Sequence, residues 1–453
     1  MQKILDLIKK VLPKSVLKKI RPLVHGFLAY LAACRYGFPS SKMIVIGVTG
    51  TAGKSSTIQM LAHILNANSV KCGYSTTVGF SDGVREEVNR QGLSMPGRFS
   101  LQGYLRRMLK AGCRCALVEC TSEGLAQNRH LGINFDIAAI TNLSQAHLDS
   151  HGGIGNYYKA KARLFAALQK ASRKKIFGKK NILANMDDPA GDLAGPFKAD
   201  AKFGISFGSI AARAFAPGKI YKVSDINSAA ETGFKVDGVP FVLNLPGEFN
   251  ARNAAFSAAL ADMLGIGLDK SSRALETFSG IAGRMQFVPN VNQLKIIVDY
   301  APEPVDLENS LRGVQRVPHN RIIHVFGSTG GHRDIGKRFE FGALSARGAD
   351  TIIMTNDDVY DSDPDKIIAD IREGINSVPE NEKRAKEIFA VPDRKSALKK
   401  ALDLALPGDI IFATGKGSEQ FLVLPGNRRI PWDEVIVIEG LLKGLPKIAI
   451  QRQ

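Results

Sequence analysis

A glycine-rich loop that joins an apolar strand to a helix constrains the fold of this chain more than any other feature. The run Met43–Val48 is followed by Gly50-Thr51-Ala52-Gly53-Lys54-Ser55-Ser56, and a helical pattern continues to Leu65. Glycines allow the backbone to turn tightly and aim amide N–H groups at phosphate oxygens, and the helix N-terminus adds partial positive charge. The loop therefore predicts nucleotide binding, with Lys54 at the β- and γ-phosphates and Ser55 on Mg²⁺.

The spacing of the loop departs from the usual phosphate-loop pattern, because five residues rather than four separate Gly47 from Gly53. A chance turn rich in glycine and serine is the alternative. The strand before the loop and the helix after it favour a phosphate loop, since the motif requires that context.

Short apolar strands alternate with amphipathic helices over most of the chain. Helices are expected to begin near Lys54, Leu101 and Tyr157. The alternation predicts an α/β fold, with a central P-loop ATPase domain built on a mainly parallel sheet and a C-terminal Rossmann-like α/β domain. The expected strands are Met43–Val48, Ala116–Glu119, Ile137–Asn142, Asn181–Ala184, Lys295–Asp299, Ile322–Phe326, Thr351–Thr355 and Ile410–Ala413.

A chain of 453 residues exceeds what one hydrophobic core normally organises, so we expect more than one domain. The predicted divisions are a basic, amphipathic helical segment at 1–42, a central ATP-binding domain at 43–282 and the C-terminal domain at 283–453. Short segments punctuated by glycine between Phe203 and Leu245 indicate a β-rich insert in the central domain.

Positive charge is concentrated at the N-terminus. The formal charge is +18, and residues 1–42 contain nine Lys or Arg against one acid, Asp6. No basic stripe interleaved with aromatic residues follows, which argues against nucleic-acid binding. The five cysteines form no C-x-x-C pair, so the sequence predicts neither disulfides nor a zinc site and favours a reducing cytosol.

The basic head contains two apolar-periodic stretches, Ile4–Ile20 and Leu23–Tyr36, with Pro13 and Pro22 as expected breaks. The second stretch is apolar for too few residues to span a bilayer, and the first lacks the layout of a cleaved signal. Two interpretations stay open for residues 1–36: peripheral contact with an anionic membrane surface, or packing on the catalytic domain of the same chain.

Polar residues after two predicted strands are further candidates for a site. Glu119 ends a buried-type strand, where a carboxylate can bind Mg²⁺ or orient water, although a solvated acid is the alternative. The block Thr141–Gly152 includes His147, Asp149 and His151, which suit a metal site, a hydrolytic site or a polar loop. Lys161 follows on a helix, where an ordinary surface lysine is the alternative.

Seven segments together match one known family: Gly50–Ser56, Thr141–Gly152 with Lys161, Leu245–Asn253, Gly283–Met285, Val298–Ala301, Arg333–Arg338 and Gly415–Glu419. They occur in the order seen in Mur ligases, and the chain most resembles the tripeptide synthetases of that family. The resemblance covers nearly everything from about residue 43 to about residue 435.

The resemblance implies an ATP-dependent, ADP-forming ligase of peptidoglycan synthesis. In this family a carboxylate of a muramoyl peptide takes the γ-phosphate of ATP, and the amine of an amino acid attacks the acyl phosphate. By resemblance Lys54, Glu119, His147 and Lys161 are catalytic. Ser55 and Glu119 would hold one Mg²⁺, His147 a second, and a carbamylated Lys161 would serve the metal site.

Two further sets of residues are implied in the same way. The substrate-binding set is Thr121, Ser122, Arg333, Lys337, Tyr360, Gly415 and Glu419. The nucleotide-binding set is Gly50, Thr51, Gly53, Lys54, Ser55, Ser56, Asn185, Asn250, Asn253, Arg284 and Asp299. For Asp299 and for a further residue, Arg394, a strand-end acid and a solvated arginine are the alternatives.

Three departures from the family pattern bear on the substrate. The 42 residues before the first strand are too few for a separate uridine-binding domain, so we expect a different or absent uridine handle. Tyr360 replaces an arginine that meets the far carboxylate of diaminopimelate, which favours another amino acid, lysine among them. Pro302, Glu303, Ser418 and Glu123 also replace family residues, so substrate positioning should differ.

The sequence is also compatible with two other functions. A folylpolyglutamate-synthetase-like ligase also carries this phosphate loop and lacks the uridine domain. A non-catalytic nucleotide-binding partner of a cell-wall complex is a third hypothesis. We expect a cytoplasmic protein, at the inner face of the membrane if its head contacts lipid.

Overall fold

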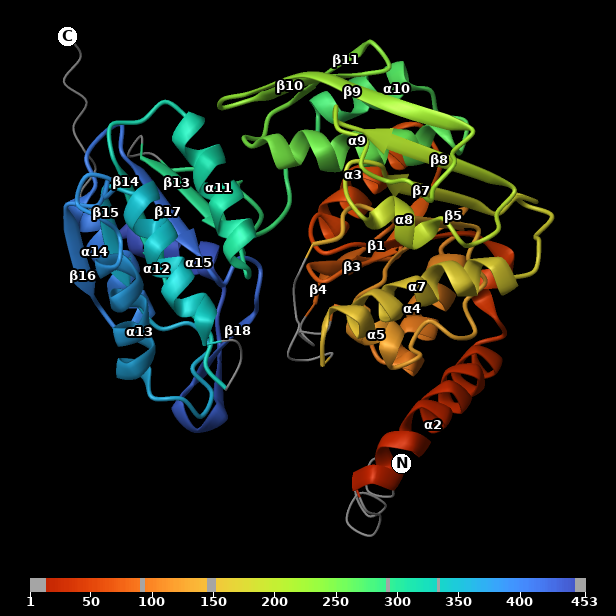
Figure 1. Cartoon of the computed structure of the whole chain (residues 1–453), viewed down its shortest axis with the longest axis horizontal. Coiled ribbons are helices and arrows are strands. Elements are labelled where there is room, and N and C mark those ends of the chain that lie inside the picture. The colour runs from red at the N-terminus through yellow and green to blue at the C-terminus, as the bar shows by residue number, and fades with distance from the viewer. Residues whose placement is uncertain (1–13, 90–93, 145–151, 291–293, 332–334, 445–453) are drawn as a thin grey trace. The chain divides into compact units, whose positions relative to one another are not determined.

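The structure is a computed structural model that describes residues 14–89, 94–144, 152–290, 294–331 and 335–444, with side chains from Val24 onward. Internal contacts divide the chain into two units (Figure 1). The first comprises Met1–Val223 and Ala255–Ser271, and the second Ser224–Ala254 and Ser272–Gln453. The α/β fold class predicted from the sequence is confirmed.

The larger sheet has eleven strands among the described residues, in the order β11-β10-β9-β8-β7-β6-β1-β5-β2-β3-β4. The pairings from β2 through β5, β1, β6, β7 and β8 to β9 are parallel, and β3 and β4 are antiparallel additions. The strands are β1 (Ile44–Thr49), β2 (Cys72–Ser75), β3 (Gly79–Ser81), β4 (Glu86–Val88), β5 (Cys115–Glu119), β6 (Ile137–Ile140), β7 (Asn181–Asn185), β8 (Ala201–Ser206), β9 (Lys219–Ser228), β10 (Thr232–Val236) and β11 (Val239–Leu243).

Helices cover both faces of the parallel part of this sheet, because its central strands are apolar on both sides. Residues of α4 and α7 pack with alternate residues of β1, β5, β6 and β7 in one core. On the other side lies α3, to which α9 is joined by a hydrogen bond from Ser257 Oγ to the Thr57 carbonyl (2.9 Å). The helices are α3 (Lys54–Ala67), α4 (Arg98–Lys110), α5 (Ser122–Ala126), α7 (Ile154–Lys170), α8 (Ala190–Ala194), α9 (Glu248–Asp262) and α10 (Leu268–Glu276).

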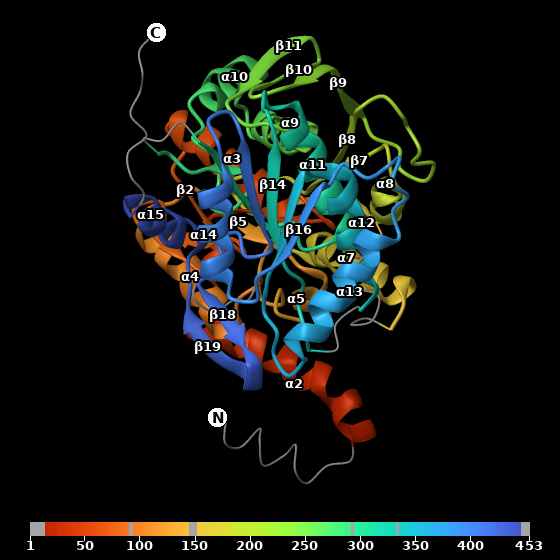
Figure 2. The ribbon, with the colours of Figure 1, turned by 90° about the vertical axis from the view of Figure 1, so that its left-hand side faces the viewer.

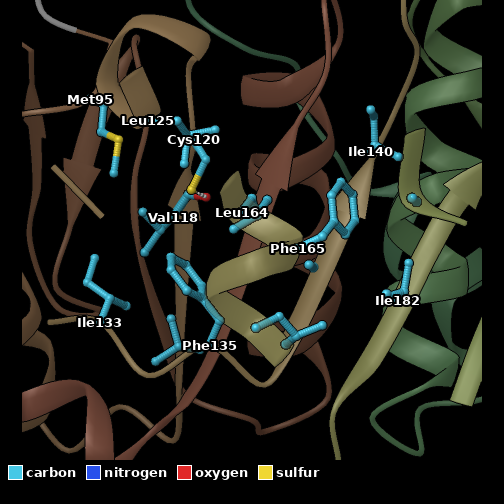
Figure 3. Packing of buried hydrophobic residues seen from close by; sticks show 14 of the residues in the cluster. Met95, Val118, Cys120, Leu125, Ile133, Phe135, Ile140, Leu164, Phe165 and Ile182 are labelled. Atoms are coloured by element: carbon cyan, nitrogen blue, oxygen red, sulfur yellow. Dashed lines mark hydrogen bonds between the residues drawn. The ribbon is translucent and has the colours of Figure 1, made fainter. Parts of the chain in front are cut away.

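Packing beneath α7 explains why residue 47 is a glycine although it lies outside the phosphate loop. Val118, Phe135, Leu164 and Phe165 lie together there (Figure 3). A Cβ on Gly47 would lie 2.7 Å from Leu164 Cδ1 and 2.8 Å from Phe135 Cε1. Gly47 is therefore a packing residue within β1, and the phosphate loop proper begins at Gly50.

The second unit contains a sheet of order β12-β13-β17-β14-β15-β16, parallel except for β12. One face packs against α11, α12 and α13, and the other against α14 and α15 (Figure 2). A small hairpin, β18 with β19, completes it. The elements are β12 (Gln286–Phe287), β13 (Lys295–Asp299), α11 (Pro304–Arg316), β14 (Ile322–Phe326), α12 (Gly336–Gly348), β15 (Thr351–Met354), α13 (Pro364–Asn376), β16 (Glu387–Ala390), α14 (Arg394–Leu404), β17 (Ile410–Thr414), β18 (Phe421–Leu424), β19 (Arg428–Pro431) and α15 (Glu434–Lys443).

The basic head forms one helix, α2 (Lys14–Arg35), followed by a short 3₁₀ turn at Pro39–Lys42. The prediction of a break at Pro22 is wrong: the helix continues through it, although a proline lacks the N–H for one intrahelical hydrogen bond. Within the described residues, no helix is both long enough and apolar enough to cross a bilayer.

Candidate active site

The glycine-rich loop connects β1 to α3 and leaves the start of the helix open. Gly50 and Gly53 have φ values of 148° and 79°, which other residues rarely adopt. Gly53 is the N-cap of α3 and provides no side chain to cap the first helical N–H groups. Uncapped N–H groups and the helix dipole together favour an anion such as phosphate at this end.

The segment that follows β6 holds the loop in shape. Asn142 Oδ1 accepts hydrogen bonds from the backbone N–H groups of Thr51 (3.0 Å) and Ala52 (2.9 Å). Thr141 Oγ1 donates to the Ala52 carbonyl (2.7 Å), and a Cβ on Gly50 would lie 2.0 Å from that hydroxyl. Asn142 was not among the predicted site residues, although it stands in the matched block and is the last residue of a predicted strand.

Ser55 and Glu119 meet at the carboxyl ends of β1 and β5. Ser55 Oγ donates to Glu119 Oε2 at 2.7 Å. Thr77, which sequence reasoning missed, donates to the same carboxylate through its N–H (2.7 Å) and its hydroxyl (2.8 Å). Glu119 is buried, so the interpretation of a solvated acid is wrong. A hydroxyl and a carboxylate this close are the oxygen ligands that Mg²⁺ prefers.

Two lysines converge on the Gly50 carbonyl. Lys54 Nζ donates to it at 3.1 Å and to the Thr51 carbonyl at 2.9 Å, and Lys161 Nζ donates to Gly50 at 2.6 Å. Lys161 is only 1% exposed and lies over the Tyr157 ring, so it is not a surface lysine. Burial and the nearby Lys54 charge lower the pKa of Lys161 well below its usual range, against an opposing effect of Glu119.

Other predicted residues of the first unit have structural partners. Thr121 is the N-cap of α5 and accepts from Gly124 N, Ser122 is buried, and Ser56 is buried at the start of α3. Asn185 Nδ2 donates to Asp188 (3.0 Å), and Asp188 accepts from Leu143 N (3.3 Å), which joins the end of β7 to the segment after β6. His147, Asp149 and His151 lie outside the described residues.

In the second unit, Arg284 and Asp299 lie close together around a turn. The Arg284 guanidinium lies 4.4 Å from the centre of the Tyr300 ring. Asp299 accepts from Ser310 Oγ (2.6 Å) and from the Met285 backbone (3.1 Å), and burial raises its pKa. Asn250 and Asn253 lie on α9, where Asn250 Nδ2 donates to the Pro246 carbonyl (2.8 Å).

The turn at Gly283 also packs against the loop after β17. A Cβ on Gly283 would lie 2.1 Å from Ser418 N, and one on Gly417 would lie 2.8 Å from the Gly283 carbonyl. Two matched segments far apart in sequence therefore lie side by side. Gly415 has a φ of 107°, and a Cβ there would lie 2.5 Å from Asp357 Oδ2.

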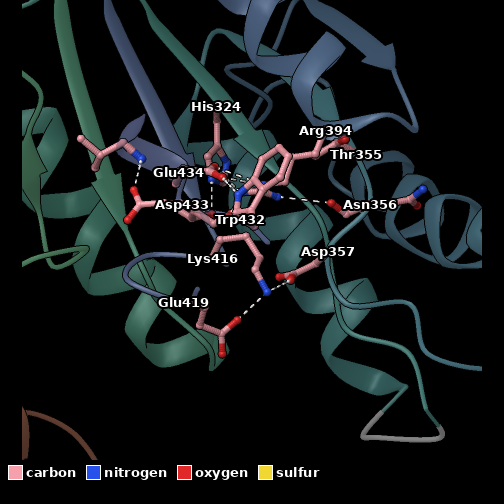
Figure 4. A network of polar contacts seen from close by, with 12 residues as sticks. His324, Thr355, Asn356, Asp357, Arg394, Lys416, Glu419, Trp432, Asp433 and Glu434 are labelled. Carbon is pink, nitrogen blue, oxygen red and sulfur yellow. Dashed lines mark hydrogen bonds and ion pairs between the residues drawn. The ribbon is translucent and has the colours of Figure 1, made fainter. Parts of the chain in front are cut away.

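A buried lysine neutralises the acids around this loop (Figure 4). Lys416 Nζ donates to Asp358 Oδ1 (2.7 Å) and Glu419 Oε2 (2.5 Å), with Asp357 Oδ1 at 3.5 Å. Burial alone would lower the pKa of Lys416, but the carboxylates of Asp357, Glu419 and Asp358 outweigh burial and raise it. These three acids lie close enough together to hold a metal ion, but the ammonium already supplies their counter-charge.

Lys337 and Tyr360 also have neighbours that the sequence did not predict. Lys337 Nζ forms an ion pair with Glu303 Oε2 at 2.6 Å, so the unusual Glu303 neutralises a predicted substrate-binding lysine. Tyr360 has a φ of 54° and its ring lies beside Gly331. Arg333 lies outside the described residues.

Arg394 is buried and bonds to three residues of the second unit, so the interpretation of a solvated arginine is wrong. It pairs with Glu434 (2.6 Å) and donates to the carbonyls of Thr414 (2.8 Å) and Asn356 (3.4 Å). Glu434 also accepts from Trp432 Nε1 at 2.6 Å. Arg394 thus connects α15 to the last residue of β17 and to Asn356 in the loop after β15 (Figure 4).

Comparison with known proteins agrees with this arrangement. The Mur ligase middle domain matches residues 48–261, and the glutamate ligase domain of Mur ligases matches residues 283–417. A UDP-N-acetylmuramyl-tripeptide synthetase of Roseiflexus sp. (strain RS-1) is 35% identical over 425 residues, which cover 91% of this chain and 81% of the relative. The chain belongs to the Mur ligase family.

Solved structures of Mur ligases share the fold. A UDP-N-acetylmuramoyl-L-alanyl-D-glutamate–2,6-diaminopimelate ligase is 27% identical with a TM-score of 0.58, covering 89% of this chain and 78% of that one. The MurF ligase of Thermotoga maritima in complex with ADP is 16% identical with a TM-score of 0.62, covering 93% and 83%. The resemblance inferred from the sequence motifs is therefore confirmed.

Proposed function

We propose that this Mur ligase uses ATP to activate a carboxylate of a muramoyl peptide as an acyl phosphate and joins it to the amine of an amino acid. The observation that carries the proposal is the meeting of Ser55 with Glu119 (2.7 Å) beside Lys54 and Lys161 on the Gly50 carbonyl. Positive charge and Mg²⁺ ligands thus lie together at an open helix N-terminus, as phosphoryl transfer requires.

Each residue has a distinct role in the proposed reaction. The α3 N-terminus and Lys54 bind the phosphates of ATP and stabilise the charge that develops during transfer. Ser55 and Glu119 would hold Mg²⁺, with Thr77 orienting the carboxylate, and the bound ion would neutralise phosphate oxygens. His147 and Lys161 are assigned to a second metal position by family resemblance.

Lys161 suits the carbamylation that the family resemblance implies. Addition of CO₂ requires the neutral amine, and the lowered pKa of Lys161 increases the neutral fraction near pH 7. The neutral amine forms an N–C bond with CO₂ and releases one proton. Together with the proton that the ammonium loses beforehand, two protons leave, and a cation becomes an anionic oxygen ligand. The Gly50 carbonyl and the Tyr157 ring hold the amine in place for this change.

The added amino acid is proposed to differ from diaminopimelate. Tyr360 is neutral and cannot form the bidentate contact by which an arginine meets a carboxylate. Asp357 and Asp358 lie just before it and are already paired with Lys416, so they offer no cation to a second carboxylate. An amino acid with one carboxylate, such as lysine, does not need the missing arginine.

Phosphate release from ATP tests the proposal. Purified protein is incubated with muramoyl peptides and with lysine, ornithine, diaminopimelate or neutral amino acids in turn. We expect release that depends on both acceptor and amino acid, and its loss in Lys54→Ala. A preference for diaminopimelate would refute the role assigned to Tyr360, and release without any acceptor dependence would refute the ligase proposal.

The same assay separates the competing functions. Turnover with a folate acceptor and glutamate but not with a muramoyl peptide would support a folylpolyglutamate-synthetase-like ligase. Nucleotide binding without turnover would support the non-catalytic partner. We place the reaction in the cytoplasm at the inner face of the membrane, because the basic N-terminal segment suits an anionic lipid surface.

A further inference from the structure

Helix α2 has two unlike faces along its C-terminal half. Ala29, Ala32 and Ala33 are buried, whereas Phe27 and Tyr30 are 68% and 55% exposed. Small side chains allow a helix to approach its neighbour closely, so the alanine face is the one that packs on the first unit. The aromatic face is left open to solvent.

Specific contacts hold the alanine face in place. A Cβ on Gly132 would lie 2.7 Å from Ala33 Cβ and 3.3 Å from the Ala29 carbonyl, so the helix and this loop are in close contact. Arg98 Nε on α4 donates to the His25 carbonyl at 2.9 Å. The N-terminal part of α2 then extends away from the rest of its unit, beyond α4 and α5 (Figures 1 and 2).

The exposed residues form a continuous apolar stripe. Phe27, Tyr30, Leu31 and Cys34 are exposed and recur at steps of three and four residues, which places them on one side of a helix. An aromatic and aliphatic stripe of this length is unusual on a free surface and marks a docking face.

The charge of the helix identifies the partner. Lys14, Lys18, Lys19, Arg21 and Arg35 lie within α2, which contains no Asp or Glu. Basic residues gain electrostatic energy at an anionic lipid surface, and aromatic side chains favour the boundary between headgroups and acyl chains. A second copy of the chain would bring the same positive charge and would be repelled.

We propose that the stripe of Phe27, Tyr30, Leu31 and Cys34 docks α2 on an anionic bilayer, while the alanine face holds the catalytic unit to it. The two sequence interpretations of the head thus apply to opposite faces of one helix. A catalytic unit held in this way meets acceptors carried on a lipid. Membrane binding requires no turnover, so it can be tested independently of the ligase proposal.

Vesicle co-sedimentation tests the docking face. The full chain is mixed, without ATP, with vesicles of phosphatidylcholine alone or of phosphatidylcholine with phosphatidylglycerol, at low and high salt. We expect binding to the anionic vesicles that weakens at high salt, and at least about tenfold weaker binding for Phe27→Ser/Leu31→Ser. The matched control is Ile210→Ser/Leu406→Ser, since Ile210 and Leu406 are similarly exposed elsewhere; it should bind like the native chain.

The alternatives give different results. Equal binding by the native chain and Phe27→Ser/Leu31→Ser, or no binding to anionic vesicles, would overturn the proposal. Dimerisation of the native chain that the same variant abolishes would assign the stripe to a second copy instead. Thermal unfolding of each variant shows that it is folded, and its phosphate release in solution should remain unchanged.

Discussion

The amines at the phosphate loop of the first unit and the cations in the loop network of the second unit have different partners. In the first, Lys54 and Lys161 donate to the Gly50 carbonyl, a neutral acceptor. In the second, Lys416 and Arg394 donate to carboxylates. Backbone oxygens hold the amines at the phosphate loop, whereas pairs of opposite charges hold the loops of the second unit in place. The comparison predicts catalytic loss from changes at the phosphate loop and stability loss from changes in the loop network of the second unit.

The largest effect is expected at Lys161. Lys161→Ala removes the buried amine beside Gly50 and should lower turnover by about 10³-fold, the size seen when one preorganised electrostatic group is lost. Lys159→Ala is the control, because Lys159 is exposed on the same helix. Phosphate-release rates measure both. Equal activity of the two variants would show that burial of Lys161 serves the fold alone.

Carbon dioxide gives a second readout for the same residue. Since carbamylation requires CO₂, degassed buffer should lower the activity of the native enzyme and bicarbonate should restore it. Lys161→Ala should not respond to bicarbonate. Activity that is indifferent to CO₂ would contradict the role proposed for the neutral amine.

A smaller effect, on stability, is expected at Arg394. Arg394→Met leaves the buried carboxylate of Glu434 without its cation and should lower the free energy of unfolding by about 3–5 kcal/mol. Lys399→Met on the same helix breaks an exposed pair with Asp403 and should cost less than about 1 kcal/mol. Denaturant unfolding measures both, and similar values for the two variants would contradict the contrast between the units.

The effect that is smallest at neutral pH concerns His324 and grows only as the pH falls. Burial, with a contribution from Arg394, lowers the pKa of His324 to about 3, and its ring stacks on Phe326 and Phe412. The unfolded chain takes up this proton near pH 6.5, so the free energy of unfolding should fall as the pH drops from about 6.5 toward 3, by up to about 1.4 kcal/mol per pH unit. His324→Phe should show a flatter dependence, and an unchanged slope would refute this assignment.

Much of the fold follows from the sequence because strand and helix periods are local. Strands such as Lys295–Asp299 and Ile322–Phe326 are confirmed to the residue, and the phosphate loop has the predicted strand and helix on either side. Glu119 was found because the carboxyl ends of parallel strands meet at one edge of a sheet. The motif order then identified the family.

Features that depend on tertiary packing could not be predicted from the sequence. The burial of Lys161 and Arg394 is set by neighbours distant in sequence, so their local patterns resembled exposed residues. Thr77 and Asn142 act through hydrogen bonds that no spacing rule encodes. The continuity of α2 through Pro22 shows how a strong apolar pattern can outweigh a helix-breaking residue.

An isotope-transfer measurement tests the central claim most directly. The acceptor carboxylate is labelled with ¹⁸O, and the inorganic phosphate released with each amide bond is examined by mass spectrometry. If the Ser55–Glu119 site activates the carboxylate as an acyl phosphate, one labelled oxygen must leave with the phosphate when the amine attacks. Phosphate free of label, with amide formed at the normal rate, would contradict the proposed reaction.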